Sequence, residues 1–308
     1  MKKPLIILTG PTAIGKTSLS IKLAKAVNGE IISADSMQVY KIMDIGTAKI
    51  TSEEMEDVPH YLIGEITPDE EFSVVKFQQY AKRYIKDIYE RNKVPILVGG
   101  TGFYIQSILY DIDFKENDTD TSYRTQLEQL AISKGSDYLH ELLAKVDPES
   151  GNTIHPNNTK RIIRALEYIK QTGEPISVHN AEQRKKESPY NYKYFVLIGN
   201  RSKLYEAINQ RVDIMVENGL IEEVKGLMSM GYTNDLVSMQ GLGYKEIIDY
   251  LEGRSTLSEA IEILKRNTRH YAKKQLTWFR REKDVIWVNK DDFSDEADIV
   301  DYLLKNLI

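Results

Sequence analysis

The strongest chemical signal in the sequence is a run of eight residues, Gly-Pro-Thr-Ala-Ile-Gly-Lys-Thr at positions 10–17. This spacing is typical of a phosphate-binding loop. Its glycines let successive backbone N–H groups turn inward, its lysine adds a positive charge, and its last hydroxyl suits Mg²⁺. A helix that starts within the loop adds the positive end of its dipole. The predicted phosphate ligands are Gly10, Pro11, Thr12, Ala13, Ile14, Gly15, Lys16 and Thr17, with Thr17 as the metal-binding residue.

The alternative interpretation of this run is a strand-to-helix turn that binds nothing. However, the signature requires a strand before it and a helix after it, and both are predicted. Residues 5–8 are a short apolar run typical of a buried parallel strand. The following residues Leu19, Leu23, Ala26 and Val27 share one helical face. The sequence therefore predicts a phosphate or diphosphate ligand.

A carboxylate, Asp35, follows a second apolar run at residues 30–33. Ligands of open α/β sheets bind beyond the carboxyl ends of the strands, so we expect Asp35 beside the phosphate loop. Asp35 and Ser36 are also residue types that commonly cap helices, and that role stays open. Near Thr101, the glycines of residues 99–102 would let the backbone approach a ligand closely, although a plain tight turn explains them almost as well.

The elements that must position these residues alternate between apolar runs and helical patterns. Further strands are predicted at residues 59–63, 94–98, 194–198 and 284–288, and helices at residues 74–88, 204–215 and 258–281. Residues 111–190 are polar, with helical periods and no strand. We therefore predict an α/β fold with a P-loop NTPase-like parallel sheet flanked by helices. Residues 1–110 and 191–308 would form this core, and residues 111–190 a helical insertion domain.

Composition excludes several classes of protein. The 308 residues include no cysteine, which excludes disulfides, thiolate metal sites and a cysteine nucleophile, and is compatible with a reducing cytosol. The net charge of −5 argues against indiscriminate nucleic-acid binding. The apolar run at residues 5–8 is too short for a signal peptide, and we expect no membrane anchor.

The predicted helix at residues 258–281 carries an unusual charge pattern. It holds a basic stripe, and between Lys265 and Lys283 there are eight Lys or Arg and one acid. This is the electrostatic footprint of a polyanion-binding surface, and aromatic residues such as Trp278 could stack on bases. A solvated helix face is the alternative. Ser258 is the predicted helix cap, with Glu259 in the first turn.

Together these motifs resemble the bacterial tRNA dimethylallyltransferase family, whose members place an isopentenyl group on the adenosine 3′ of the anticodon. The resemblance covers nearly the whole chain and is carried by residues 10–17, 33–40, 44–49, 99–102, 160–167, 243–245 and 272–280. The chain differs from the family pattern at Tyr61 and Gly64, where a second histidine and an acid are common.

The resemblance implies dimethylallyl diphosphate as the donor, Mg²⁺ as the cofactor and the anticodon stem-loop of tRNA as the partner of a cytoplasmic monomer. Lys16, Arg211 and Mg²⁺ on Thr17 would offset charge on the leaving diphosphate. Asp35 would be the general base. The implied tRNA contacts are Asp35, Ser36, Met37, Gln38, Thr101, Arg124, Lys160, Arg161, Arg164, Gln240, Gly243, Tyr244, Lys245, Lys273, Lys274, Gln275, Trp278 and Arg280.

Two other classes of function remain open on the sequence. A P-loop kinase for a nucleoside or small molecule would bind ATP in the same loop, but it leaves the basic helix unexplained. A non-catalytic RNA-binding switch would need neither Lys16 nor Asp35. The donor's chain length and the set of tRNAs are not determined by the sequence.

Overall fold

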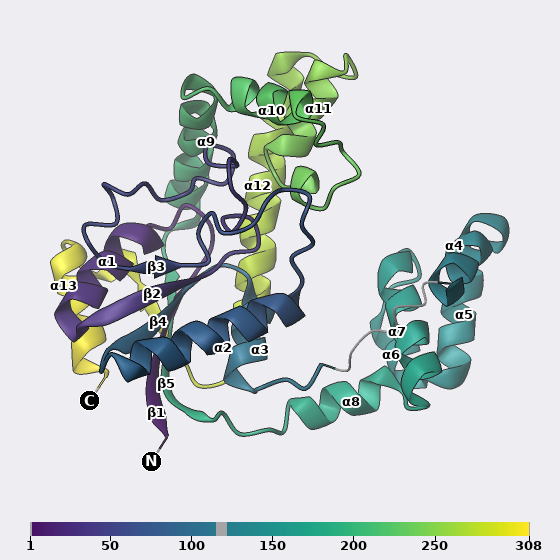
Figure 1. The fold of residues 1–308 in the computed structure, drawn as a ribbon, viewed down its shortest axis with the longest axis horizontal. Coiled ribbons are helices and arrows are strands. Elements are labelled where there is room, and N and C mark those ends of the chain that lie inside the picture. Colours follow the sequence, from purple (N-terminus) through teal and green to yellow (C-terminus); the bar gives the residue numbers. More distant parts are fainter. Residues whose placement is uncertain (1, 115–121, 308) are drawn as a thin grey trace. The chain divides into compact units, whose positions relative to one another are not determined.

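The computed structural model describes residues 2–114 and 122–307. The chain divides into two compact units, Met1–Leu109 with Pro189–Ile308, and Tyr110–Ser188 (Figure 1). The boundaries expected from the sequence, at 111 and 190, lie within two residues of these.

The larger unit is built on a parallel sheet with the strand order β3-β2-β4-β1-β5-β6. This confirms the predicted fold class. The strands are β1 (Lys3–Thr9), β2 (Gly29–Ala34), β3 (His60–Tyr61), β4 (Val94–Gly99), β5 (Tyr190–Ile198) and β6 (Val285–Asn289). The expected strand at residues 59–63 is reduced to two residues, and β5 starts four residues earlier than expected.

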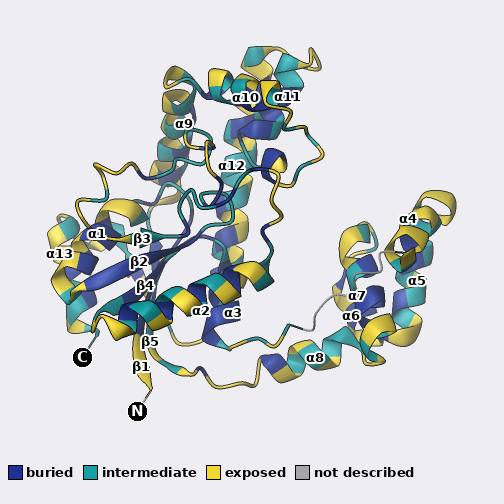
Figure 2. Cartoon of the chain, in the orientation of Figure 1, coloured by how far each residue is buried: buried dark blue, intermediate teal, exposed yellow. Residues whose placement is uncertain are grey.

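Helices cover both faces of this sheet (Figure 1). Those of the larger unit are α1 (Lys16–Val27), α2 (Val74–Glu90), α3 (Gly102–Leu109), α9 (Arg201–Glu217), α10 (Leu220–Ser229), α11 (Tyr244–Leu251), α12 (Leu257–Phe279) and α13 (Glu296–Lys305). Two short 3₁₀ turns, Ser238–Gln240 and Lys290–Asp292, connect them. α1 packs with α13 on one face, and α2 packs with α3 on the other. Figure 2 shows the buried residues concentrated in the strands and on the inner sides of the helices.

The buried face of α1 differs from the one expected. Leu19 and Leu23 are fully buried, and each such side chain contributes about 1.5–3 kcal/mol by leaving water. Ala26 is exposed, and the remaining inner positions are taken by Ile21 and Ala24. The buried face of α1 therefore includes Ile21 and Ala24, which the expected i, i+4, i+7 pattern left out, and it excludes Ala26, which that pattern included.

Strand register brings three chain segments to one edge of the sheet. Thr9 pairs with Gly99, Ala34 pairs with Gly99, and Thr9 pairs with Val196 on the other side. Because the strands are parallel, the residues that follow them emerge together. The phosphate loop, Asp35 and the glycine turn at residues 99–102 therefore lie at the same carboxyl edge.

The smaller unit is helical in the part that the structure describes. Its helices are α4 (Ser122–Lys134), α5 (Ser136–Val146), α6 (Pro148–Thr153), α7 (Thr159–Thr172) and α8 (Ile176–Gln183). Leucines and isoleucines of α4, α5 and α7 form its core. Buried Asp147 accepts hydrogen bonds from Ser150 N (3.0 Å) and Ser177 N (3.0 Å), so one carboxylate fixes the start of α6 to the start of α8.

The start of α12 corrects the expectation that Ser258 caps it. The cap is Thr256: its hydroxyl accepts from Glu259 N at 3.3 Å, and Glu259 Oε2 accepts from Thr256 N at 2.8 Å. This reciprocal pair satisfies two N–H groups that the helix leaves unpaired. The Thr-x-x-Glu spacing was visible in the sequence and places the helix start two residues before the position assigned to Ser258.

We expect Thr256→Ala to lower the free energy of unfolding by about 1 kcal/mol, because a cap hydrogen bond is lost. Ser258→Ala is the matched control. Its side chain is exposed inside the first turn of α12, and the change should cost little. Urea denaturation of the two variants measures the difference, and equal losses would contradict the assignment of the cap.

Candidate active site

The phosphate loop connects β1 to α1 and is shaped by two glycines. Gly10 has φ 148°, and a Cβ there would lie 2.6 Å from Leu197 O in β5. Gly15 has φ 89° and immediately precedes α1, and a Cβ there would lie 2.7 Å from Lys290 Nζ. Both backbone conformations favour glycine, and at Gly10 the backbone of β5 also leaves no room for a side chain. The loop is therefore held close to β5 and to the segment after β6.

Lys16 folds back over this loop. Its Nζ donates to Gly10 O (3.0 Å) and Pro11 O (2.8 Å). Burial, together with the nearby charge of Arg211, lowers its pKa to about 7, while the Asp35 carboxylate acts in the opposite direction. Arg211 reaches the loop from α9 and donates through Nη1 to Thr12 Oγ1 at 3.4 Å, and burial lowers its pKa as well. Two half-buried cations thus meet at the loop.

Asp35 lies at the end of β2, and its electrostatic influence extends to both cations. Its Oδ1 accepts from Met37 N (2.8 Å) and Gln38 N (3.4 Å), which closes a turn. The helix-cap alternative is therefore partly correct: Asp35 caps a turn, but no helix starts there. Burial and the Asp35 charge raise the pKa values of the Tyr104 and Tyr271 hydroxyls, so two aromatic side chains also lie near the carboxylate.

At residues 99–102, other atoms of the protein occupy the space that side chains in place of the glycines would need. A Cβ on Gly99 would lie 2.3 Å from Ala34 O, and one on Gly102 would lie 2.1 Å from the Trp278 ring. Thr101 N donates to Ala34 O at 3.1 Å, which ties this turn to the residue before Asp35. Thr101 Oγ1 is buried and lies within hydrogen-bonding reach of the Tyr271 hydroxyl. These two hydroxyls therefore lie close to Asp35.

Gln275 faces the interior of the larger unit. It was predicted to contact RNA, but it is 5% exposed. Its side-chain amide accepts from Thr12 N at 2.9 Å and donates to Gly100 O at 3.0 Å. The amide is occupied inside the protein because it connects the phosphate loop to the glycine turn.

The basic stripe of α12 divides into two halves. In the first half, Lys265 pairs with Asp213 at 2.7 Å, and Arg269 donates to Asn209 Oδ1 at 2.5 Å. In the second half, the side chains are exposed and form no ion pair within residues 2–114 and 122–307: Lys273, Lys274, Arg280 and Arg281. Within the described residues, most of the exposed cations without an ion pair therefore lie in the second half, and Arg266 is the exposed cation of the first half.

Two hollows flank these free cations. One, of about 630 Å³, is lined by cations and aromatic rings of α9, α12 and β6, including Arg201, Tyr205, Lys273, Arg280 and Trp287. The other, of about 460 Å³, is lined by His270, Lys273, Lys274, Thr277, Trp278 and Arg281. Neither lining contains a carboxylate. This surface is electrostatically suited to a polyanion with flat rings, such as single-stranded nucleic acid.

Comparison with known proteins decides the family. Residues 38–282, well over half of the chain, match the family model described as IPP transferase. The chain belongs to the IPP transferase family. A tRNA dimethylallyltransferase of Lachnoclostridium phytofermentans is 62% identical over 305 residues, covering 99% of this chain and 97% of its own. A similarly named protein of Acetivibrio thermocellus is 53% identical over 298 residues, covering 96% of this chain and 94% of its own.

Solved structures agree with this family assignment. The full-length tRNA isopentenylpyrophosphate transferase of Bacillus halodurans is 47% identical, with a TM-score of 0.74, and the match covers 99% of this chain and 97% of that one. A eukaryotic dimethylallyltransferase described as acting on tRNA is 29% identical, with a TM-score of 0.81, and the match covers 99% of this chain and 80% of that one.

Several other residues were expected to contact tRNA. Their side chains form hydrogen bonds within the protein. Tyr244 is fully buried and its hydroxyl donates to Glu223 Oε1 at 2.7 Å, so this side chain is occupied inside the protein, and its RNA contact stays a prediction. Gln38 Nε2 donates to Thr47 O (3.3 Å) and Ala48 O (3.2 Å). Gln240 is exposed and donates to Asn234 Oδ1 at 2.7 Å.

The remaining expected tRNA contacts of the larger unit differ in exposure. Ser36 and Met37 are half-buried beside the site. Gly243 has φ 97° at the start of α11, and half-buried Lys245 pairs with Glu246 at 3.7 Å.

Glu223 is a residue that sequence reasoning missed. Its carboxylate accepts from three consecutive backbone N–H groups, Asp44 N (2.8 Å), Ile45 N (2.7 Å) and Gly46 N (3.0 Å). Together with the Tyr244 hydroxyl, these donors use its full accepting capacity. Glu223 thus anchors the 44–49 segment to α10 and α11. No sequence signal pointed to it, because α10 was not predicted.

In the smaller unit, the candidate RNA contacts cluster around α7. Arg124 donates to Glu167 through Nε (2.9 Å) and Nη2 (2.8 Å), so its charge is largely neutralised. Lys160 and Arg161 are exposed in the first turn of α7. Arg164 is half-buried, and burial lowers its pKa. Lys160 and Arg161 are the most accessible cations of this group.

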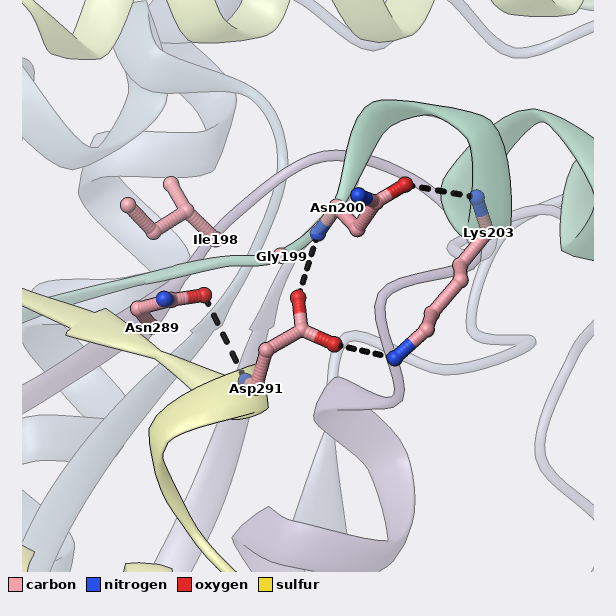
Figure 3. Close-up of a pocket in the computed structure, with 6 residues that line it drawn as sticks. All are labelled: Ile198, Gly199, Asn200, Lys203, Asn289 and Asp291. Carbon is pink, nitrogen blue, oxygen red and sulfur yellow. Dashed lines mark hydrogen bonds and ion pairs between the residues drawn. The ribbon is translucent and has the colours of Figure 1, made fainter.

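A third hollow, of about 470 Å³, lies at the carboxyl ends of β5 and β6 (Figure 3). Asp291 dominates it: the carboxylate accepts from Asn200 N at 2.5 Å and pairs with Lys203 at 2.6 Å. The adjacent Lys290 donates to Ile14 O in the phosphate loop at 3.0 Å. The charges in this hollow are paired internally, so we assign it to holding α9 and the loop in place.

The lowered pKa of Lys16 predicts proton uptake on anion binding. With a pKa of about 7, Lys16 is mostly neutral at pH 8, and a bound polyanion should restore its charge. Inorganic pyrophosphate should therefore bind more weakly as pH rises through 7, and binding at pH 8 should take up a proton.

Calorimetry in two buffers of different ionisation enthalpy measures this proton. Lys16→Arg is the matched control, because a guanidinium stays charged at every pH used. Equal proton uptake by the wild type and Lys16→Arg would contradict the prediction.

Proposed function

We propose that this protein transfers a dimethylallyl group from dimethylallyl diphosphate to the N6 amine of the adenosine 3′-adjacent to the anticodon in tRNA. Diphosphate is released. The observation that carries the proposal is the convergence of Lys16, Arg211 and Asp35 at one sheet edge. The activity named for relatives that match over nearly the full length supports it.

The two cations suit the leaving group. As the C–O bond to diphosphate breaks, negative charge grows on the departing oxygens, and buried cations stabilise that charge strongly because little water screens it. Lys16 would exchange the Gly10 and Pro11 carbonyls for phosphate oxygens. The N–H groups at the start of α1 would add to this stabilisation.

Asp35 suits the proton that must leave. N6 attacks the first carbon of the allyl group, and a proton of the amine passes to the carboxylate. Because only Oδ1 is engaged by the turn, Oδ2 is available for this step among the described contacts. Thr101 Oγ1, which is buried beside the Tyr271 hydroxyl, would help to hold the adenine.

Mg²⁺ fits this site through one protein ligand. No cluster of three His, Cys, Asp or Glu side chains suited to a metal occurs in the described residues. Thr17, exposed in the first turn of α1, would hold the ion together with diphosphate oxygens and water. When bound, Mg²⁺ offsets charge on the leaving diphosphate.

The RNA would be held by the free half of the α12 stripe, together with Lys160 and Arg161 of the smaller unit. An adenosine cannot react while stacked in an anticodon loop, so it must be extruded at a cost of a few kcal/mol. No helix in the described part of the chain is long and apolar enough to cross a membrane. We propose that the enzyme acts as a cytoplasmic monomer.

The direct test combines the protein with bulk tRNA that lacks the modification, and with either dimethylallyl diphosphate or ATP. Digested nucleosides are then weighed by mass spectrometry. Prenylated adenosine with the diphosphate donor supports the proposal. Consumption of ATP with phosphate transfer would indicate the kinase alternative, and no reaction with either donor would indicate a binding protein.

We expect Asp35→Asn to slow single-turnover transfer by about 10²-fold to 10⁴-fold, because the proton acceptor is lost. The amide oxygen can still accept from Met37 N, so folding and pyrophosphate affinity should change little. Added Mg²⁺ should not restore the rate.

Asp69→Asn is the control for Asp35→Asn, since Asp69 is exposed and far along the chain from the site. It should react like the wild type. Wild-type rates in Asp35→Asn, with the product confirmed by mass, would contradict the assignment of Asp35 as the general base.

Neutralising the free half of the stripe should weaken tRNA binding and reduce its salt dependence. Each phosphate contact releases counterions, so Lys273→Gln, Lys274→Gln and Arg280→Gln combined should lower the log–log salt slope by about two. Filter binding across a salt series measures this slope. Lys86→Gln with Lys305→Gln, two exposed lysines of α2 and α13, should leave it unchanged. An unaltered slope in the triple variant would mean that this face is merely solvated.

A further inference from the structure

We propose that Gln275 is a positioning residue that holds the phosphate loop and the 99–102 turn in fixed register. The inference rests on the proposed function, because it concerns the same site. It assigns Gln275 a role different from the RNA contact expected from the sequence.

The contacts of Gln275 use both ends of one amide. Oε1 accepts from Thr12 N at 2.9 Å, and Nε2 donates to Gly100 O at 3.0 Å. An amide can accept at one end and donate at the other, whereas a carboxylate only accepts and a thioether does neither well. Gln275 is 5% exposed, so neither hydrogen bond competes with bulk water.

The turn is shaped to receive this amide. A Cβ on Gly100 would lie 2.1 Å from Gln275 Nε2, and its next nearest atoms would be Gln275 Cδ at 3.3 Å and Gly10 O at 3.7 Å. Gly100 is not among the residues with positive φ, so an alanine would suit the backbone. What excludes a side chain at position 100 is therefore Gln275 itself.

The two backbone groups that Gln275 binds, Thr12 N and Gly100 O, lie beside different parts of the proposed reaction. Thr12 lies in the phosphate loop and also receives Arg211 at its hydroxyl. Gly100 directly precedes Thr101, whose N–H donates to Ala34 O, next to Asp35. One side chain thus links the group that stabilises the diphosphate to the turn that flanks the base. A misplacement of about 1 Å between reacting groups can cost about 10²-fold in rate.

The neighbouring residue on α12 provides a matched contrast. Lys274 is exposed and has no ion pair within the described residues, whereas Gln275 is buried. Adjacent positions on one helix therefore serve different surfaces. Changing one should alter RNA affinity, and changing the other should alter the donor site.

The first experiment separates these two affinities. We expect Gln275→Met to weaken inorganic pyrophosphate binding, measured by calorimetry without RNA, by about tenfold, and to slow single-turnover transfer by at least that factor. Its affinity for tRNA without donor should stay within about twofold of the wild type. Lys274→Met should show the reverse pattern. Unchanged pyrophosphate affinity with weakened tRNA binding in Gln275→Met would overturn the proposal.

The second experiment is a double-mutant cycle across the contact. Gly100→Ala alone forces a methyl group onto the amide and should weaken pyrophosphate binding by about tenfold. In a Gln275→Ala background, the same change should add less than about twofold, because the clashing group is gone. Additive effects would overturn the proposal.

Thermal melting accompanies each variant. If Gln275→Met is unfolded at the assay temperature, Gly100→Ala keeps the glutamine and decides alone, and normal pyrophosphate affinity in it overturns the proposal. A wild-type protein that fails to bind pyrophosphate would overturn the proposed function, and this inference with it. Wild-type binding that Gln275→Met leaves unchanged overturns only the role of Gln275.

Discussion

Two half-buried cations beside a single carboxylate form the constraint on which the rest of this structure depends. Removing Lys16 and Arg211 from water is costly unless other groups compensate. Burial lowers the pKa of both, that of Lys16 to about 7, and the Gly10 and Pro11 carbonyls take the place of water around the ammonium. A ligand with several negative charges would supply the counter-charge that these two cations need. The site therefore has the electrostatics that the proposed diphosphate ligand would need.

Maintaining that arrangement requires loops with fixed shapes, and loops contain backbone groups that no sheet or helix pairs. In this protein, polar side chains from distant parts of the chain provide the missing partners. Gln275 and Lys290 bind the phosphate loop at Thr12 N and Ile14 O. Glu223 binds three consecutive N–H groups of the 44–46 segment. Several polar side chains that could bind a ligand thus form hydrogen bonds to the backbone of these loops instead.

Helix α12 shows how one element serves two purposes. Its first half is fixed to α9, since Lys265 pairs with Asp213 and Arg269 contacts Asn209. Its second half presents cations that have no partner in the described chain, while Gln275 on the inner side reaches the phosphate loop. Because a helix is stiff, the basic surface and the catalytic edge are placed by the same rigid body.

The sequence by itself determined the parallel α/β fold, the phosphate loop and the position of Asp35 near it. These follow from local rules: hydrophobic periodicity, glycine spacing, and the fact that parallel strands end at the same edge. Even the cap of α12 was encoded locally, in the Thr-x-x-Glu spacing that ends at Glu259. Only the tertiary structure decided which polar residues face inward. Gln275 and Tyr244 have side chains equally able to bind RNA or to satisfy a buried group, and only the packing of distant segments shows that they do the latter. Residue type fixes what a side chain can bond, whereas its partner is set by contacts between separate elements that no local pattern encodes. Gln275 and Gly100 are 175 positions apart, and Tyr244 and Glu223 are 21 positions apart.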